Sequence, residues 1–69
     1  MRYAIVVERT ASNYSAYVPD LPGCVATGMT VGETEREIRA AITFHIEGLV
    51  EDGLPVPSPS SIVEYLEVA

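Results

Sequence analysis

One long amphipathic segment, residues 30–52, constrains the fold of this 69-residue chain more than any other feature. Thr30 and Glu33 have the spacing of a capping box at its start, and Gly53 suits the left-handed conformation that ends helices. The segment therefore predicts a helix of about 22 residues, roughly 33 Å long. Its apolar positions recur every three or four residues along one face, and they are Val31, Ile38, Ala41, Ile42, His45, Ile46 and Leu49.

The residues on both sides of this segment show the alternating pattern of β-strands. Strands are predicted at residues 3–8, 14–18 and 24–27 before the helix, and at residues 62–68 after it. Pro22-Gly23 predicts a type II turn between the second and third strands, because proline presets φ and glycine accepts a positive φ. Three prolines at alternate positions, residues 55–59, exclude a helix and predict an extended connector to the last strand.

The resulting order, β-β-β-α-β, predicts an α+β fold. Three strands form a meander, and a right-handed crossover through the helix places the fourth strand parallel to the first and beside it. The expected sheet order is 3-2-1-4, with the one helix on one face. The opposite face, which includes Val6 and Tyr17, and the sheet edges are then left for another polypeptide.

Size and charge both favour a protein that works with a partner. A single domain at residues 1–69 buries only roughly 60% of its unfolded surface, and one cysteine permits no internal disulfide. We therefore expect a homo-oligomer, a dimer or higher, as the source of added stability. Ten acidic residues against four basic ones give a formal charge of −6, which disfavours sequence-independent binding of nucleic acids. The charge suits a basic partner, or it serves solubility alone.

Targeting signals are not evident in the sequence. The first residues alternate instead of forming the apolar region of a signal peptide. No apolar run approaches the roughly 18 residues of a membrane span. A cytoplasmic protein without membrane association is expected.

Residues that support catalysis are scarce, and we predict no catalytic residue, no metal and no cofactor. His45 lies on the apolar stripe of the helix and Cys24 starts a strand, so we interpret both as core residues. The strand and helix order resembles the first half of an RNase H fold, whose nucleases hold two metal ions with clustered carboxylates. Here the middle of the first strand has no acid, and Glu8 lies only at its end.

Two motifs, in the right order, carry a resemblance to the HicB-like antitoxin family. The first is Pro19-Asp20-Leu21-Pro22-Gly23-Cys24 with the following Gly28-x-Thr30-x-x-Glu33, and the second comprises residues 45–59. The resemblance covers about residues 3–68. It implies a degenerate RNase H-like domain that neutralises HicA, a small basic mRNA interferase. Many members also carry a C-terminal DNA-binding domain, for which this chain has no room, so direct DNA binding is not expected.

Five residues are the candidate partner contacts in this interpretation. Glu8 and Asp20 lie at strand ends, where acids can reach a basic surface. Tyr17 is expected on the uncovered face, and Glu64 and Tyr65 on the fourth strand. The alternative is a homo-oligomeric structural or interaction protein that uses the uncovered face for self-association. A remnant hydrolase is a third possibility, which requires a carboxylate cluster that the sequence lacks.

Overall fold

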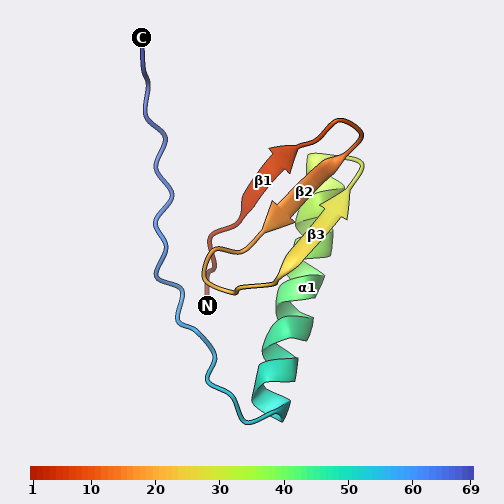
Figure 1. The fold of residues 1–69 in the computed structure, drawn as a ribbon, viewed down its shortest axis with the longest axis vertical. Coiled ribbons are helices and arrows are strands. Elements are labelled where there is room, and N and C mark those ends of the chain that lie inside the picture. Colours follow the sequence, from red (N-terminus) through yellow and green to blue (C-terminus); the bar gives the residue numbers. More distant parts are fainter.

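The computed structural model describes residues 1–69 and consists of a three-stranded antiparallel sheet with one helix against it (Figure 1). The strands are β1 (Val6–Arg9), β2 (Tyr14–Tyr17) and β3 (Val25–Gly28), in the order β1-β2-β3, and the helix is α1 (Val31–Glu51). The predicted α+β class, the meander and the single helix are confirmed.

The register of the strands sorts their side chains onto two faces. One row runs across the sheet through Val7, Ala16 and Ala26, and these residues belong to the core or pack against it. Helix α1 lies on this face, where it inserts Ile38 (Figure 1). The fully buried core consists of Ala16, Val18, Leu21, Cys24 and Ile38. The helix thus covers one face of the sheet, as the sequence predicted.

The ends of helix α1 are fixed by the residues that the sequence indicated. Thr30 is the N-cap, and its Oγ1 accepts a hydrogen bond from the Glu33 N–H at 3.0 Å. The Glu33 carboxylate reaches back to the N–H of Met29, at 3.2 Å, one residue further than in a standard capping box. Gly53 follows the helix with φ of +70°. Both predicted caps are therefore confirmed.

The loop between β2 and β3 contains the predicted turn. The Cys24 N–H donates to the Leu21 carbonyl oxygen at 3.0 Å, and Gly23 between them has φ of +84°. Leu21 and Cys24 are buried under the sheet, so this loop is part of the core. The turn therefore joins two strands and also closes one end of the helix–sheet interface.

The predicted fourth strand and the sheet order 3-2-1-4 are not confirmed, because the sheet of this structure has three strands. Residues 54–69 contain no helix or strand, and no backbone hydrogen bond joins residues 62–68 to β1. The connector is held to the body by the Tyr3 hydroxyl, which donates to the Pro57 carbonyl oxygen, and by contacts at Ser60 and Ser61. Beyond these contacts the chain diverges from the sheet (Figure 1), so its N–H groups find no acceptor on β1.

Gly28 marks the closest approach of β3 to helix α1, and its replacement provides a test of this packing. A Cβ atom there would lie 2.6 Å from Thr34 Oγ1 and 2.7 Å from the Thr34 backbone nitrogen. Because that nitrogen belongs to the first turn of the helix, the backbone must move. We expect Gly28→Ala to lower the free energy of unfolding by about 1–3 kcal/mol, measured by urea denaturation.

Gly48→Ala is the matched control for this substitution. A Cβ at Gly48 meets no atom within 4 Å, and alanine is the better helix former. Its stability should stay the same or rise by up to about 1 kcal/mol. Equal losses in both variants would contradict the packing described for Gly28.

Candidate partner-binding surface

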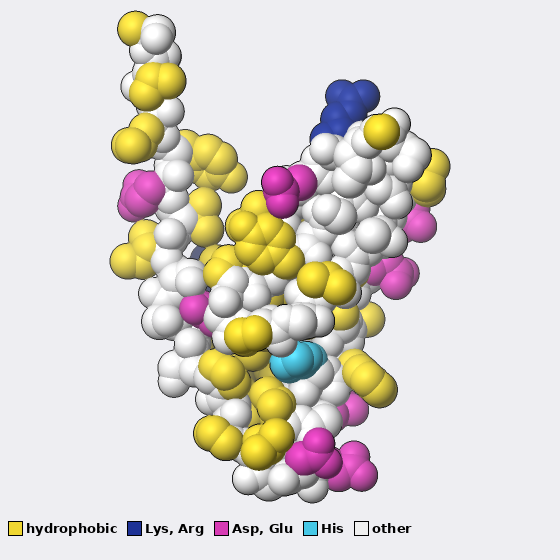
Figure 2. Space-filling model, viewed as in Figure 1, with side chains coloured by type: hydrophobic (Ala, Val, Ile, Leu, Met, Phe, Trp, Pro, Cys, Tyr) yellow, Lys and Arg dark blue, Asp and Glu magenta, His cyan; other side chains and the backbone are white.

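The sheet face opposite helix α1 is the first candidate surface, and we call it the open face. It consists of an apolar row across the three strands and a polar row beside it, Val6–Tyr17–Val25 and Glu8–Ser15–Thr27. Tyr17 is 42% exposed and Val25 is 64% exposed. Figure 2 shows apolar side chains gathered over the sheet on this side of the molecule. No element of this chain covers the row.

This composition suits contact with another protein. An antiparallel sheet with one wet face normally places polar residues there, in alternation with the core residues. The open face breaks that alternation with three adjacent apolar side chains, and exposed apolar patches mark interaction sites. Glu8 borders the row and is exposed. The face therefore combines apolar contact with negative charge, as a basic partner requires.

Val25 is the member of this row that sequence analysis missed. Cys24 and Ala26 point toward the core. Because successive side chains of a strand alternate between faces, Val25 must point away from the core. That period was present in the sequence and would have placed Val25 on the open face.

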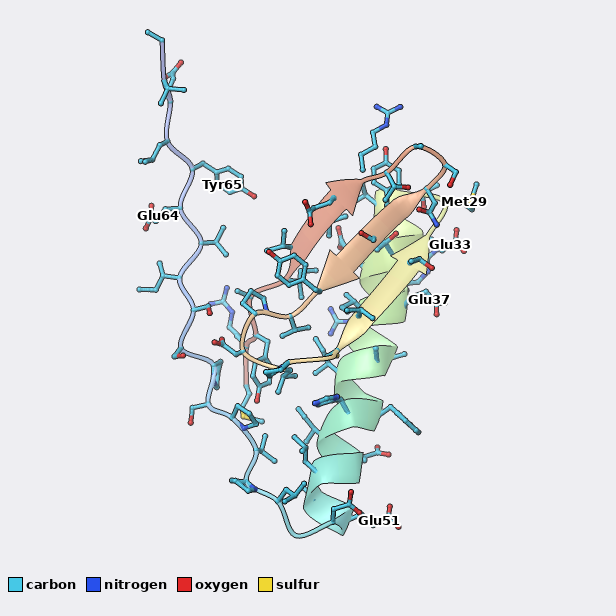
Figure 3. The ribbon with its side chains drawn as sticks, in the orientation of Figure 1. Met29, Glu33, Glu37, Glu51, Glu64 and Tyr65 are labelled. Carbon is cyan, nitrogen blue, oxygen red and sulfur yellow. The ribbon has the colours of Figure 1, made fainter.

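The second candidate surface is the segment 62–68, which we call the arm. All of its residues are exposed, and Tyr65 reaches 92%. Figure 3 shows the Tyr65 side chain directed toward the body and Glu64 directed away from it. The large apolar residues of the arm are Ile62, Val63, Tyr65, Leu66 and Val68. Exposed apolar side chains in an unpaired extended segment make the arm a second candidate contact surface.

Asp20, in the loop after β2, anchors the foot of the arm. Its carboxylate accepts hydrogen bonds from the N–H groups of Ser60 and Ser61, both at 3.0 Å, and from their hydroxyls at 3.2 and 2.7 Å. The N–H and hydroxyl of Ser61 contribute most to a lowered pKa of Asp20, and those of Ser60 add to it, while desolvation opposes the shift. Asp20 was predicted to contact a partner, and the structure shows this carboxylate engaged within the chain.

Acidification should release this anchor. The pKa of an aspartate in an unfolded chain is about 3.9. A carboxylate whose pKa is lowered by folding stabilises the folded state above that pH, and this stabilisation is lost as the pH falls through the lower pKa of the folded state. We expect the amide proton signals of Ser60 and Ser61 to be constant above about pH 5 and to move together below about pH 4 in an NMR titration. Asp20→Asn removes the titrating group and should abolish this transition. A transition that persists in Asp20→Asn would assign it to another group.

The structure brings together only part of the predicted contact set. Glu8 and Tyr17 share the open face on neighbouring strands. Glu64 and Tyr65 lie on the arm, apart from the sheet (Figure 3), and Asp20 lies at the arm's foot. Contact between any of these five residues and a partner stays a prediction.

Cys24 and His45, the two side chains considered for catalysis, lie in different surroundings. Cys24 is buried in the core, as predicted, and burial raises the pKa of its thiol, which disfavours the nucleophilic thiolate. His45 is half-buried on α1. No group of three or more His, Cys, Asp or Glu side chains is arranged to hold a metal ion. No helix in it combines the length and apolar character needed to cross a bilayer.

Comparison with known proteins gives consistent matches over nearly the whole chain. A family described as "HicB_like antitoxin of bacterial toxin-antitoxin system" matches residues 3–68. An uncharacterized 14.9 kDa protein in the rep-hol intergenic region of Haemophilus phage HP1 is 39% identical over 66 residues, which are 96% of this chain and 50% of the phage protein. A UPF0150 protein of Helicobacter pylori strain J99 is 35% identical over 65 residues, 93% of this chain and 90% of that protein.

A solved structure resembles this fold as well. One chain of a "HicA3 and HicB3 toxin-antitoxin complex" superposes with a TM-score of 0.75 at 33% sequence identity. The match covers 87% of this chain and 70% of that chain. This chain therefore spans half of the phage relative and most of the other two.

Proposed function

Since the chain belongs to the HicB-like antitoxin family, as its two motifs predicted, we propose that it binds and neutralises a small basic mRNA interferase of the HicA type. The observation that carries the proposal is the likeness to a chain from a HicA3–HicB3 complex, at 33% identity over 87% of this chain. The description of the family as an antitoxin supports a regulatory role. The proposal accordingly includes no enzymatic activity and no cofactor, and it places the protein in the cytoplasm.

The open face is the surface that we assign to the toxin. Charge and apolar contact have separate roles in such a complex. The formal charge of −6 attracts a basic protein over distance. The row Val6–Tyr17–Val25 then supplies the apolar contact that excludes water. Tyr17 occupies the middle of the row, and tyrosine is enriched among residues that dominate binding energy. Blocking the RNA-binding surface of the toxin would neutralise it.

The arm completes the sheet in the assembled protein in this proposal. Pairing of residues 62–68 along the free edge of β1 gives the order 3-2-1-4. Glu64 and Tyr65 would then lie beside β1, at the border of the open face, where the predicted contacts with the toxin become possible. Asp20 contributes by holding the foot of the arm. We assign no DNA contact to this chain, because its ten acids outnumber its four basic residues.

The proposal requires an adjacent gene for a small basic protein, and co-expression with the product of that gene tests it. The neighbour alone should arrest growth, and co-expression of this chain should restore growth to the level of an empty-vector control. The two proteins should also co-purify. A harmless neighbour, or a toxic one that neither binds this chain nor is relieved by it, would refute the assignment.

A homo-oligomeric interaction protein is the second candidate, favoured by the exposed apolar arm. The two functions are compatible, because self-association through the edge of β1 leaves the open face free. The co-expression experiment separates them. Self-association without a toxic neighbour leaves only the second candidate.

A further inference from the structure

The arm and the free edge of β1 both lack a strand partner within this chain. The arm exposes five large apolar side chains and has no strand partner, whereas β1 pairs with β2 on one side only. Figure 1 shows the arm extended beyond its own sheet, and Figure 2 shows it standing clear of the body. A strand edge and an unpaired extended segment bind each other by β-augmentation.

We propose that two copies of this chain exchange their arms, so that the arm of each copy pairs along β1 of the other. The inference rests on the proposed fourth strand and is independent of toxin binding. Each copy supplies one arm and receives one, so the contact is the same on both copies and closes at a dimer. The protein then gains the second subunit that a domain of this size needs.

Length and chemistry both match a second copy's arm to this edge. The arm has seven residues, 62–68. Strand β1 has four residues, Val6–Arg9, and extension of the pairing over the three residues before it would give an edge of the same length, roughly 23 Å. Pairing gives the arm's N–H and C=O groups the partners that they lack in the single chain. Tyr3, Ile5 and Val7 pack on the margin of the core, where they provide apolar neighbours for the arm's inward-facing side chains.

The anchor at Asp20 favours exchange over folding back onto the same sheet. Four hydrogen bonds fix Ser60 and Ser61, and beyond them the arm runs away from its own β1 (Figure 1). A cleft of about 350 Å³, lined by Arg2, Tyr3, Ala4, Ser61 and Val63, separates the first arm residues from the start of the edge. The edge is therefore left open to a strand from elsewhere.

Sedimentation of the purified chain without toxin is the first part of the test. The chain should sediment at micromolar concentration as a dimer, with twice the chain mass of 7.4 kDa. Deletion of residues 62–69 should give a monomer. Tyr65→Pro with Leu66→Pro should also give a monomer, because adjacent prolines remove a ladder N–H whichever side faces β1. The helical circular dichroism of both variants should match that of the parent, which checks that the body remains folded.

Disulfide trapping distinguishes exchange from folding back. In a Cys24→Ser background, Val6→Cys is combined in turn with Glu64→Cys, Tyr65→Cys or Leu66→Cys, which covers both faces and neighbouring registers. Oxidation of at least one pair should give a covalent dimer on a non-reducing gel. Phe44→Cys, on the outer side of α1, replaces Val6→Cys in the control and should give none.

Each other outcome overturns the exchange. A disulfide within one chain, together with a monomeric mass, would leave the fourth strand in place and refute the exchange. A monomer without any disulfide would refute both. A dimer that persists after deletion of residues 62–69 would place self-association on another surface. None of these results depends on the toxin.

Discussion

Ile38→Ala is expected to unfold most of this protein at room temperature. Ile38 is 1% exposed and is the helix residue in the fully buried apolar cluster beneath the sheet. Truncation of a buried isoleucine costs about 2–5 kcal/mol, from lost apolar burial and the cavity left behind. A domain of this size rarely has more than about 3–5 kcal/mol in total. One substitution therefore removes most of the stability.

Urea denaturation followed by circular dichroism measures this loss. Ile38→Val removes a single methyl group and should cost about 0.5–1.5 kcal/mol, which keeps the effect measurable if the alanine variant is unfolded. Val50→Ala, at an exposed position of the same helix, is the control and should stay within about 0.5 kcal/mol of the parent. Similar losses for Ile38→Ala and Val50→Ala would mean that the helix does not pack as described.

Tyr17→Ala should produce the largest loss of toxin binding among single substitutions on the surface. Tyr17 lies between Val6 and Val25 in the row across the open face and is 42% exposed in the free chain. A central tyrosine that becomes buried on binding typically contributes at least about 2 kcal/mol, which corresponds to roughly a 30-fold weaker affinity. The substitution leaves the fully buried core unchanged, so the variant should remain folded.

Calorimetric titration with the purified toxin measures this effect. Phe44→Ala is the matched control, because Phe44 is an aromatic residue that is 79% exposed on helix α1. Its removal should leave the affinity unchanged within about twofold, as for a residue outside the interface. Loss of affinity in Phe44→Ala but not in Tyr17→Ala would move the toxin site from the sheet to the helix.

Local sequence signals predicted the folded body well, because each depends on residues close in the chain. The capping pair Thr30 and Glu33 placed the start of the helix, and Gly53 placed its end. Pro22-Gly23 placed the turn whose hydrogen bond joins Leu21 and Cys24. These interactions span three or four residues, so the sequence contains both partners of each.

The position of the arm could not be predicted in the same way. Alternation in residues 62–68 indicates a strand, but it does not specify the sheet or the chain that the strand joins. The contact that directs the arm joins Asp20 to Ser60 and Ser61, about 40 residues away in sequence. The sequence indicated only that Asp20 lies at a strand end, as a candidate partner contact. No local pattern links it to two serines so far along the chain.

The open face shows an intermediate case. The single helix predicted that one face would be uncovered, and Tyr17 was placed there correctly. The row that Tyr17 forms with Val6 and Val25 depends on strand register. The geometry of the hairpin loops sets that register, and the sequence alone did not give this geometry. Sequence thus indicated the surface, and the structure supplied the apolar row within it.

NMR spectra of the labelled chain, recorded during titration with the unlabelled toxin, test most directly whether the toxin binds to the open face. The methyl signals of Val6 and Val25 and the ring signals of Tyr17 should shift or broaden as toxin is added. The ring of Phe44 and the methyls of Val50, on helix α1, should stay unchanged. Shifts confined to Phe44 and Val50, with Val6, Tyr17 and Val25 unaffected, would contradict the account.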